Sequence, residues 1–416
     1  MRRALAAVLA VLFFAAGAAG TALADASADL AAARAAKRSG DDAGAIQLFT
    51  RALARTDLPA AQRADAYVDR AGIFERHKRY DAVIADMRSA IELQPRLAIA
   101  YYGLGLGYHL NHDPRRAIAV YSRGLVFAPP SLVVALLNGR GRAYHDIGDD
   151  ARARADFEGA IALSPGYPFP YQNLGMLEYT QLRYDAAFAD FERLVELAPK
   201  NASAYQMRGA ISFLRDQPEA ARADFSQAIA LDPACVEAYH WRGMVNFVSR
   251  RFSDAAADFT SAARLRPAKP YDELWAYVAQ LKLKTADPAV LRTAAARFDR
   301  RAWPAPIFAL FLGQRSYSDV RALSEIAGPA PSVIASHRCE AAFYGGEFAL
   351  ANDDVAAGRS RLDEALRTCP VHDTEHDAVV AELRWMDAQP TPAASASVQP
   401  GLAIRVGRVI DWRDLL

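Results

Sequence analysis

The chain has 416 residues, of which 52% are hydrophobic and 23% are charged, and this balance is typical of globular proteins and excludes disorder over most of the length. Its 49 basic and 48 acidic residues leave a formal net charge of +1, which provides no broad electrostatic field for binding nucleic acid or an anionic membrane surface. Three cysteines without a Cys-x-x-Cys pair are too few for a disulfide-built scaffold or a paired-cysteine metal site.

Residues 1–24 have the organisation of a secretory signal peptide. Two arginines open the segment, an apolar run covers residues 4–16, and residues 22–24 read Ala-Leu-Ala, a typical cleavage pattern. A membrane anchor needs roughly twenty apolar residues, so we expect cleavage, with a retained anchor as the alternative. No later stretch approaches that length. We therefore expect a mature chain without a transmembrane segment, exported to an oxidising compartment such as the bacterial periplasm.

Residues 25–63 predict a pair of helices joined by a turn at residues 40–42, which read Gly-Asp-Asp. Ala45, Phe49 and Ala52 recur at helical spacing and form an apolar face on the second helix. The pair is a degenerate copy of the repeat that follows it. A short insertion around Pro59 separates the two.

A period of thirty-four residues organises residues 64–267. A proline that ends an apolar helix recurs six times, at intervals of thirty-four residues except for one of thirty-six. The six prolines are Pro95, Pro129, Pro165, Pro199, Pro233 and Pro267. The pattern resembles the tetratricopeptide repeat (TPR), a helix-turn-helix unit of this length. We therefore expect an all-α solenoid with six repeats in this region.

Small and aromatic residues recur at fixed places within each repeat. Glycine at the eighth place and alanine at the twentieth are expected where the two helices of a hairpin approach closely. Aromatic side chains at the twenty-fourth place are expected to fill the space between repeats. In the last copy these places hold Gly243, Ala255 and Phe259.

Arginine at the seventh place and aspartate at the twenty-third occur together in four of the six copies. The four pairs are Arg70 with Asp86, Arg140 with Asp156, Arg208 with Asp224, and Arg242 with Asp258. The second copy replaces both residues, with Leu104 and Val120, whereas the fourth keeps Asp190 opposite Leu174. The pairing predicts an ion pair inside each hairpin. The alternative is a row of arginines that binds a ligand.

Residues 268–388 continue as helices without the regular period. Helical patterning covers residues 271–284, 288–298, 306–312 and 318–326, each bounded by Pro, Gly or Ser. A further TPR hairpin is expected at residues 339–370. In its register Cys339 opens the first helix and Cys369 closes the second, which predicts a disulfide between them, with two buried free thiols as the alternative. Cys235 is expected to be a small buried residue.

The C-terminal region resembles the NlpI-type lipoproteins, which are TPR adaptors of the bacterial envelope. The resemblance rests on Trp303, residues 308–313 (Phe-Ala-Leu-Phe-Leu-Gly), residues 340–346 (Glu-Ala-Ala-Phe-Tyr-Gly-Gly), and the Val-His and Glu-His pairs at residues 371–372 and 375–376. It implies a non-catalytic adaptor whose partners are peptidoglycan hydrolases and a tail-specific protease. The chain lacks the lipid-acceptor cysteine of that family.

Residues 389–416 follow as a linker rich in Pro, Ala and Ser and a short, more apolar peptide from Gly401. We expect this peptide to dock on the last hairpin of its own chain, with docking on a partner as the alternative.

One motif suggests metal chemistry. His372, Glu375 and His376 stand in the His-x-x-Glu-His order of some zinc peptidases, but no third ligand stands at a suitable spacing. A zinc-dependent hydrolase is therefore kept only as an alternative, and we expect neither a metal, nor a cofactor, nor an enzyme.

The concave groove of a TPR array is lined by the second, fifth, ninth, twelfth and thirteenth places of each first helix. In this chain those places hold Tyr102, His109, Asn138, His145, Gln172, Met176, Tyr179, Gln206, Phe213, His240, Met244 and Phe247. Amide, imidazole and aromatic groups suit an extended peptide. The expected function is therefore a periplasmic adaptor that binds a protein or peptide partner. The alternatives are an inner face that contacts only water and a self-associating assembly or secretion scaffold such as a homodimer.

Overall fold

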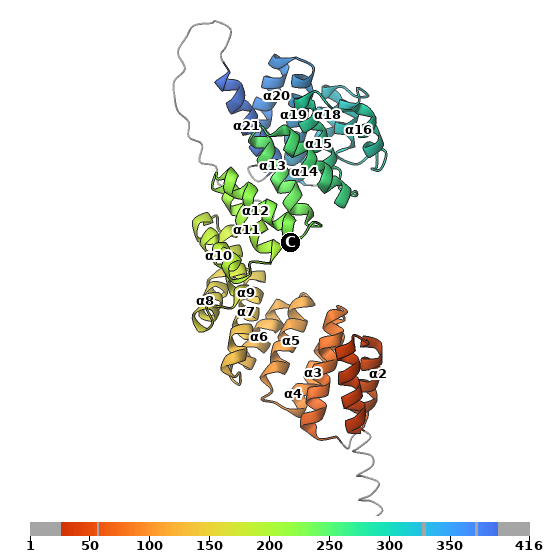
Figure 1. Cartoon of the computed structure of the whole chain (residues 1–416), viewed down its shortest axis with the longest axis vertical. Coiled ribbons are helices and arrows are strands. Elements are labelled where there is room, and N and C mark those ends of the chain that lie inside the picture. The colour runs from red at the N-terminus through yellow and green to blue at the C-terminus, as the bar shows by residue number, and fades with distance from the viewer. Residues whose placement is uncertain (1–25, 56–57, 327–329, 371–372, 390–416) are drawn as a thin grey trace, which may run out of the picture. The chain divides into compact units, whose positions relative to one another are not determined.

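The computed structural model of the chain describes residues 26–55, 58–326, 330–370 and 373–389, and the regular elements within these ranges are all helices (Figure 1). The predicted all-α helix-turn-helix architecture is therefore confirmed. The chain divides between Leu177 and Glu178 into two compact units, called unit 1 and unit 2. None of the described helices is long and apolar enough to span a membrane. The predicted signal peptide and the predicted docking of the C-terminal peptide concern residues outside the described ranges.

Unit 1 consists of consecutive helical hairpins, the first of which pairs a helix over residues 26–39 with α2. The other helices are α2 (Asp42–Leu53), α3 (Ala60–Arg76), α4 (Tyr80–Leu93), α5 (Ala98–Leu110), α6 (Pro114–Leu125), α7 (Pro130–Asp146), α8 (Asp150–Leu163) and the first part of α9 (Pro168–Thr180). Ala45, Phe49 and Ala52 are fully buried against the helix over residues 26–39, as the apolar spacing predicts.

Unit 2 begins with the end of α9 and continues the hairpins into an irregular helical region. Its helices are α10 (Tyr184–Leu197), α11 (Ala202–Leu214), α12 (Pro218–Leu231), α13 (Val236–Val248), α14 (Phe252–Leu265), α15 (Tyr271–Leu283), α16 (Pro288–Ala295), α17 (Ala305–Phe311), α18 (Tyr317–Ser324), α19 (Pro331–Ala351), α20 (Val355–Thr368) and α21 (Thr374–Ala388). The helices predicted from residue 271 to residue 326 are thus present, with ends shifted by at most three residues.

Glycine at the eighth place lies directly beneath the aromatic ring at the twenty-fourth place. A Cβ atom on Gly105 would lie 2.5 Å from Tyr121, and one on Gly141 would lie 2.6 Å from Phe157. The same Tyr121 ring closes over Gly139 of the next repeat, where a Cβ would lie 2.8 Å away. The aromatic residue therefore fills the space between repeats, and only glycine allows the rings to approach the backbone this closely.

The arginine and aspartate pairs form in all four repeats that carry them. Each guanidinium donates two hydrogen bonds to its carboxylate, over 2.6 to 2.9 Å. The four aspartates are 4–7% exposed, so the pairs are largely removed from water. This geometry confirms the predicted ion pair within each hairpin. Each guanidinium group is bound to its aspartate, which argues against the alternative in which the arginines form a row that binds a ligand.

A left-handed residue ends the first helix of every repeat, at the fifteenth place. In the six regular repeats these residues are Lys78, His112, Gly148, Leu182, Asp216 and Arg250, with φ between 56° and 78°. Gly40 and Asp353 hold the same place in the first and the last hairpins. The shared turn shows that both outlying hairpins keep the TPR register, although glycine, the residue that suits this conformation best, stands at only two of these eight places.

A disulfide joins Cys339 and Cys369, whose Cα atoms are 4.4 Å apart, as predicted. Cys369 caps the end of α20, but Cys339 does not open α19, which begins eight residues earlier at Pro331. Proline suits the first turn of a helix, and no residue between it and Cys339 breaks one. The ring of His337 in this added segment stacks on Trp303 at 4.5 Å between centroids, which supports the longer helix.

Candidate functional site

The predicted groove residues of unit 1 are all partly exposed. Tyr102, His109, Asn138, His145, Gln172 and Met176 lie on α5, α7 and α9, the first helices of three consecutive repeats. They are called the unit 1 row. No member is fully buried, so each can contact a partner in the folded state.

Neighbouring polar groups position several members of the unit 1 row. The side-chain amide of Asn173 donates a 2.8 Å hydrogen bond to the Asn138 oxygen, which orients the Asn138 amide. His109 Nδ1 lies 3.1 Å from the Asp146 carboxylate, and this contact lowers the pKa of Asp146. His145 Nδ1 lies 2.8 Å from Asp150. Oriented amide and imidazole groups of this kind can hydrogen-bond the backbone of an extended chain.

The equivalent places in unit 2 are mostly closed to solvent. Tyr179, Gln206, Phe213, Met244 and Phe247 are all 4% exposed or less, so the prediction that they line an open groove is wrong. One cause is α21, which packs against α13. Aromatic neighbours add to the closure, since the ring centroids of Phe247 and Trp275 are 5.3 Å apart.

Polar contacts hold α21 in this position. Arg250, at the end of α13, donates a 3.2 Å hydrogen bond to Glu382 and lies 3.9 Å over the ring of Trp385. Lys282 of α15 lies 2.6 Å from Glu347 and 3.2 Å from Glu382. Burial would lower the pKa of Lys282, but the two carboxylates outweigh it and raise that pKa. The ammonium thus stays charged and joins α15, α19 and α21.

Cys235 lies beside one of the closed places. Its thiol is half-buried and donates a 3.1 Å hydrogen bond to the Gln206 oxygen. Burial raises the pKa of the thiol, which disfavours the reactive thiolate.

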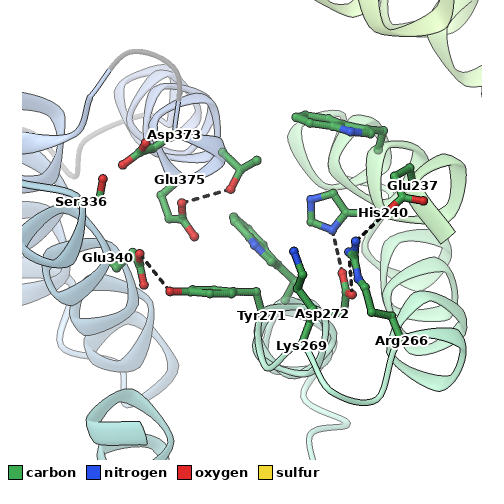
Figure 2. Close-up of a pocket in the computed structure, with 13 residues that line it drawn as sticks. Glu237, His240, Arg266, Lys269, Tyr271, Asp272, Ser336, Glu340, Asp373 and Glu375 are labelled. Carbon is green, nitrogen blue, oxygen red and sulfur yellow. Dashed lines mark hydrogen bonds and ion pairs between the residues drawn. The ribbon is translucent and has the colours of Figure 1, made fainter. Parts of the chain in front are cut away.

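A cavity of about 430 Å³ opens within unit 2, between α13, α15, α19 and the start of α21 (Figure 2). His240, the remaining predicted groove residue, lies in its repeat-side wall. His240 Nδ1 is 2.7 Å from one oxygen of Asp272, and Arg266 donates to the other oxygen over 3.1 Å and to Glu237 over 2.8 Å. Burial would raise the pKa of Asp272, but these hydrogen bonds and charges lower it. The acidic groups of this wall are therefore matched by cationic or protonatable partners.

The opposite wall carries Glu340 and Glu375, which are 7% and 5% exposed. Glu340 accepts hydrogen bonds from the Trp303 indole at 2.8 Å and the Tyr271 hydroxyl at 3.3 Å. Burial raises the pKa of both carboxyl groups; the charge of Glu375 adds to the effect on Glu340, and the charge of Asp373 adds to the effect on Glu375.

Glu375 is held in a similar way. Its two oxygens accept from the hydroxyl groups of Tyr344 at 3.2 Å and Thr374 at 3.1 Å. Trp303, Glu340, Tyr344 and Glu375 belong to the motifs singled out in the sequence, and the structure places Trp303 against Glu340 and Tyr344 against Glu375. Glu340 and Glu375 line the cavity, and this role was not predicted. A visible signal was Glu340, a charged residue directly beside the apolar run Ala341-Ala342-Phe343.

Only part of the predicted zinc motif lies within the residues that the structure describes. His372 lies outside the described residues, whereas Glu375 and His376 are buried in the first turn of α21. Within the described ranges, no three His, Cys, Asp or Glu side chains come together in a way that could hold a metal ion. The zinc-hydrolase alternative stays untested.

Comparison with known proteins places TPR sequence in both units. Residues 111–168 and 214–270 match one family model described as a tetratricopeptide repeat, and residues 170–201 match a second model with the same description. No curated protein matches the chain.

Several solved structures are similar to the chain in fold. A tetratricopeptide repeat protein from Parabacteroides merdae has 16% identity and a TM-score of 0.48, with 61% of this chain and 98% of that chain covered. PilF of Pseudomonas aeruginosa has 18% identity and a TM-score of 0.46, with 53% and 97% covered. YrrB, described as a TPR protein with an unusual peptide-binding site, has 21% identity and a TM-score of 0.33, with 44% and 92% covered.

Proposed function

We propose that this tetratricopeptide-repeat protein is a non-catalytic adaptor that binds an extended segment of a partner protein on the unit 1 row. The observation that carries the proposal is the partial exposure of all six row residues on three consecutive first helices, where the equivalent places of unit 2 are mostly buried. The row offers oriented amides and imidazoles for a peptide backbone, while Tyr102 and Met176 offer apolar surface for its side chains.

We further propose that the adaptor acts in the periplasm. The N-terminal segment supports export, and the Cys339–Cys369 disulfide suits an oxidising compartment. The resemblance to NlpI-type lipoproteins supports an envelope partner such as a peptidoglycan hydrolase or a tail-specific protease.

Binding by variants of the full mature chain tests this function. Asn138→Ala, His145→Ala and Gln172→Ala are combined in one variant. Glu92→Ala and Glu158→Ala, exposed residues on the second helices α4 and α8, form the matched control. The partner is first identified by capture from envelope extract, and its affinity is then measured with purified protein. We expect at least a tenfold loss for the row variant, about 1.4 kcal/mol, and none for the control.

Two outcomes would contradict the proposal. Equal partner affinity of the row variant and the wild type, with unchanged thermal unfolding, would exclude the row as the binding surface. A wild-type chain that light scattering shows to be a dimer, and that becomes monomeric in the row variant, would favour the self-associating scaffold instead.

A further inference from the structure

Buried carboxylates elsewhere in unit 2 are paired with cations. Asp258 is held by Arg242 at 2.6 Å, and Glu347 is held by Lys282 at the same distance. Asp272 meets both Arg266 and His240. Among the residues that the structure describes, Glu340 and Glu375 form no such ion pair, and their hydrogen-bond donors are the uncharged groups of Trp303, Tyr271, Tyr344 and Thr374.

Neutral donors orient a carboxylate but do not neutralise it. Two neighbouring buried carboxylates without a cation are costly, and they lower that cost by taking up a proton or by binding a positively charged ligand. The raised pKa of both groups reflects this cost. Each carboxylate oxygen that accepts one hydrogen bond keeps capacity for another, so the pair can still accept from a ligand.

The cavity also has the size and the surfaces to hold a cation. Its volume of about 430 Å³ lies within the range of small-ligand sites. Tyr271 and Trp241 line it, and aromatic faces attract cations. Trp241 is 5% exposed, and its indole N–H has no hydrogen-bond partner among the described residues, so it can donate to a carbonyl oxygen of the molecule that carries the cation. Figure 2 shows Glu340, Asp373 and Glu375 on one side of the space and His240, Arg266 and Asp272 on the other.

We propose that this cavity binds a primary ammonium group of a polypeptide, with Glu340 and Glu375 as its anionic ligands and the aromatic side chains as its apolar walls. The group comes either from a free amino terminus or from a lysine-type side chain, which share this chemistry. The site lies wholly within unit 2, so it does not depend on the unit 1 row.

Calorimetry on the full mature chain with defined probes tests the assignment. The probes are tri-alanine amide with a free amino terminus, the same peptide N-acetylated, and N-acetyl-lysine methylamide. We expect saturable binding of at least one amine probe and none of the acetylated peptide. Binding of tri-alanine amide assigns the amino terminus, and binding of the lysine derivative assigns the side chain. Equal binding of the acetylated peptide, or no binding of any probe, would overturn the proposal.

Three variants locate the ammonium ligands. Glu340→Gln with Glu375→Gln keeps the side-chain shapes, removes both charges and is expected to weaken binding at least tenfold in a protein that still unfolds cooperatively. Glu237→Gln alters the opposite wall of the same cavity and is expected to change binding less than twofold. Lys269→Ala removes the chain's own ammonium from the cavity lining and is expected to leave binding intact or strengthen it. Undiminished binding by the double variant, or lost binding in Lys269→Ala, would contradict the assignment.

Discussion

The first helices of unit 1 and unit 2 carry the same repeat pattern but present different surfaces. Met176 in unit 1 and Met244 in unit 2 stand at the ninth place of their repeats, yet Met176 is partly exposed and Met244 is fully buried. The repeat places each side chain on the inner face in both units. Exposure depends on what packs over that face, and in unit 2 α21 packs there. A repeat pattern therefore identifies a candidate groove without showing whether it is open.

The largest expected effect concerns the ion pair that both units share. Arg242→Leu leaves Asp258 buried without its cation and is expected to lower the free energy of unfolding by about 3–5 kcal/mol. The double variant Arg242→Leu, Asp258→Val is expected to recover most of this loss, although Ser226 and Asn246 also lose partners. Chemical denaturation measures both. Equal losses in the single and double variants would contradict an ion-pair role.

The disulfide precedes the helix that closes the inner face of unit 2. Replacing Cys339 and Cys369 by Ala opens a loop of sequence separation 30 and is expected to cost about 3–4 kcal/mol. Hydrogen exchange in α13 and α21 should accelerate more than exchange in α5 and α7. Before reduction, the denatured wild type should show one reactive thiol, that of Cys235, and a count of three would exclude the bridge.

Substitution of the two methionines at the ninth place tests directly whether the inner face is more buried in unit 2 than in unit 1. Met244→Ala is expected to cost about 3 kcal/mol because the side chain is fully buried. Met176→Ala is expected to cost about 1 kcal/mol because only part of its apolar surface is buried. Thermal and urea unfolding compare them. Costs that agree within about 0.5 kcal/mol would remove the distinction between an open and a closed inner face.

A further expected effect is a pH dependence of stability that arises from Glu340, which forms no ion pair among the described residues. Burial and the charge of Glu375 raise the pKa of Glu340 in the folded state, so folding retains its proton where the unfolded chain loses it. Stability attributable to this group therefore falls as pH rises from the unfolded-state pKa through the folded-state pKa.

Glu340→Gln removes that dependence. Relative to the wild type, the variant should gain stability as pH rises from 4.5 to 7.5, by about 1.4 kcal/mol for each pH unit by which the folded-state pKa exceeds the unfolded one. Urea unfolding at several pH values measures the difference. A difference in stability that does not change with pH would show that folding does not raise the pKa of Glu340.

The parts of the fold that follow from neighbouring residues are predictable from the sequence. The repeat period sets the hairpins, the glycine beneath each aromatic ring and the Arg–Asp pairs, because all of these contacts lie within one repeat or between adjacent repeats. The disulfide follows for the same reason, since it closes a single hairpin.

The closed inner face and the cavity of unit 2 depend on contacts between residues that are far apart in the sequence. Arg250 and Glu382 meet across 132 residues, and Trp303 reaches Glu340 across 37. No repeat pattern relates these positions, so the burial of Met244 and the pairing of Glu340 with Trp303 could not be predicted from the period. These residues can be recognised in the sequence as charged or aromatic side chains within apolar helices, but the sequence does not show which of them contact one another.

Site-specific photo-crosslinking tests the central claim, that a partner segment binds the unit 1 row. A photoreactive amino acid replaces Gln172 in one version of the full chain and Glu158, an exposed residue of α8, in another. We expect position 172 to crosslink to one continuous segment of an envelope protein and position 158 not to crosslink to it. Crosslinks from position 172 to another copy of this chain, equal crosslinking from both positions, or none from position 172 would contradict it.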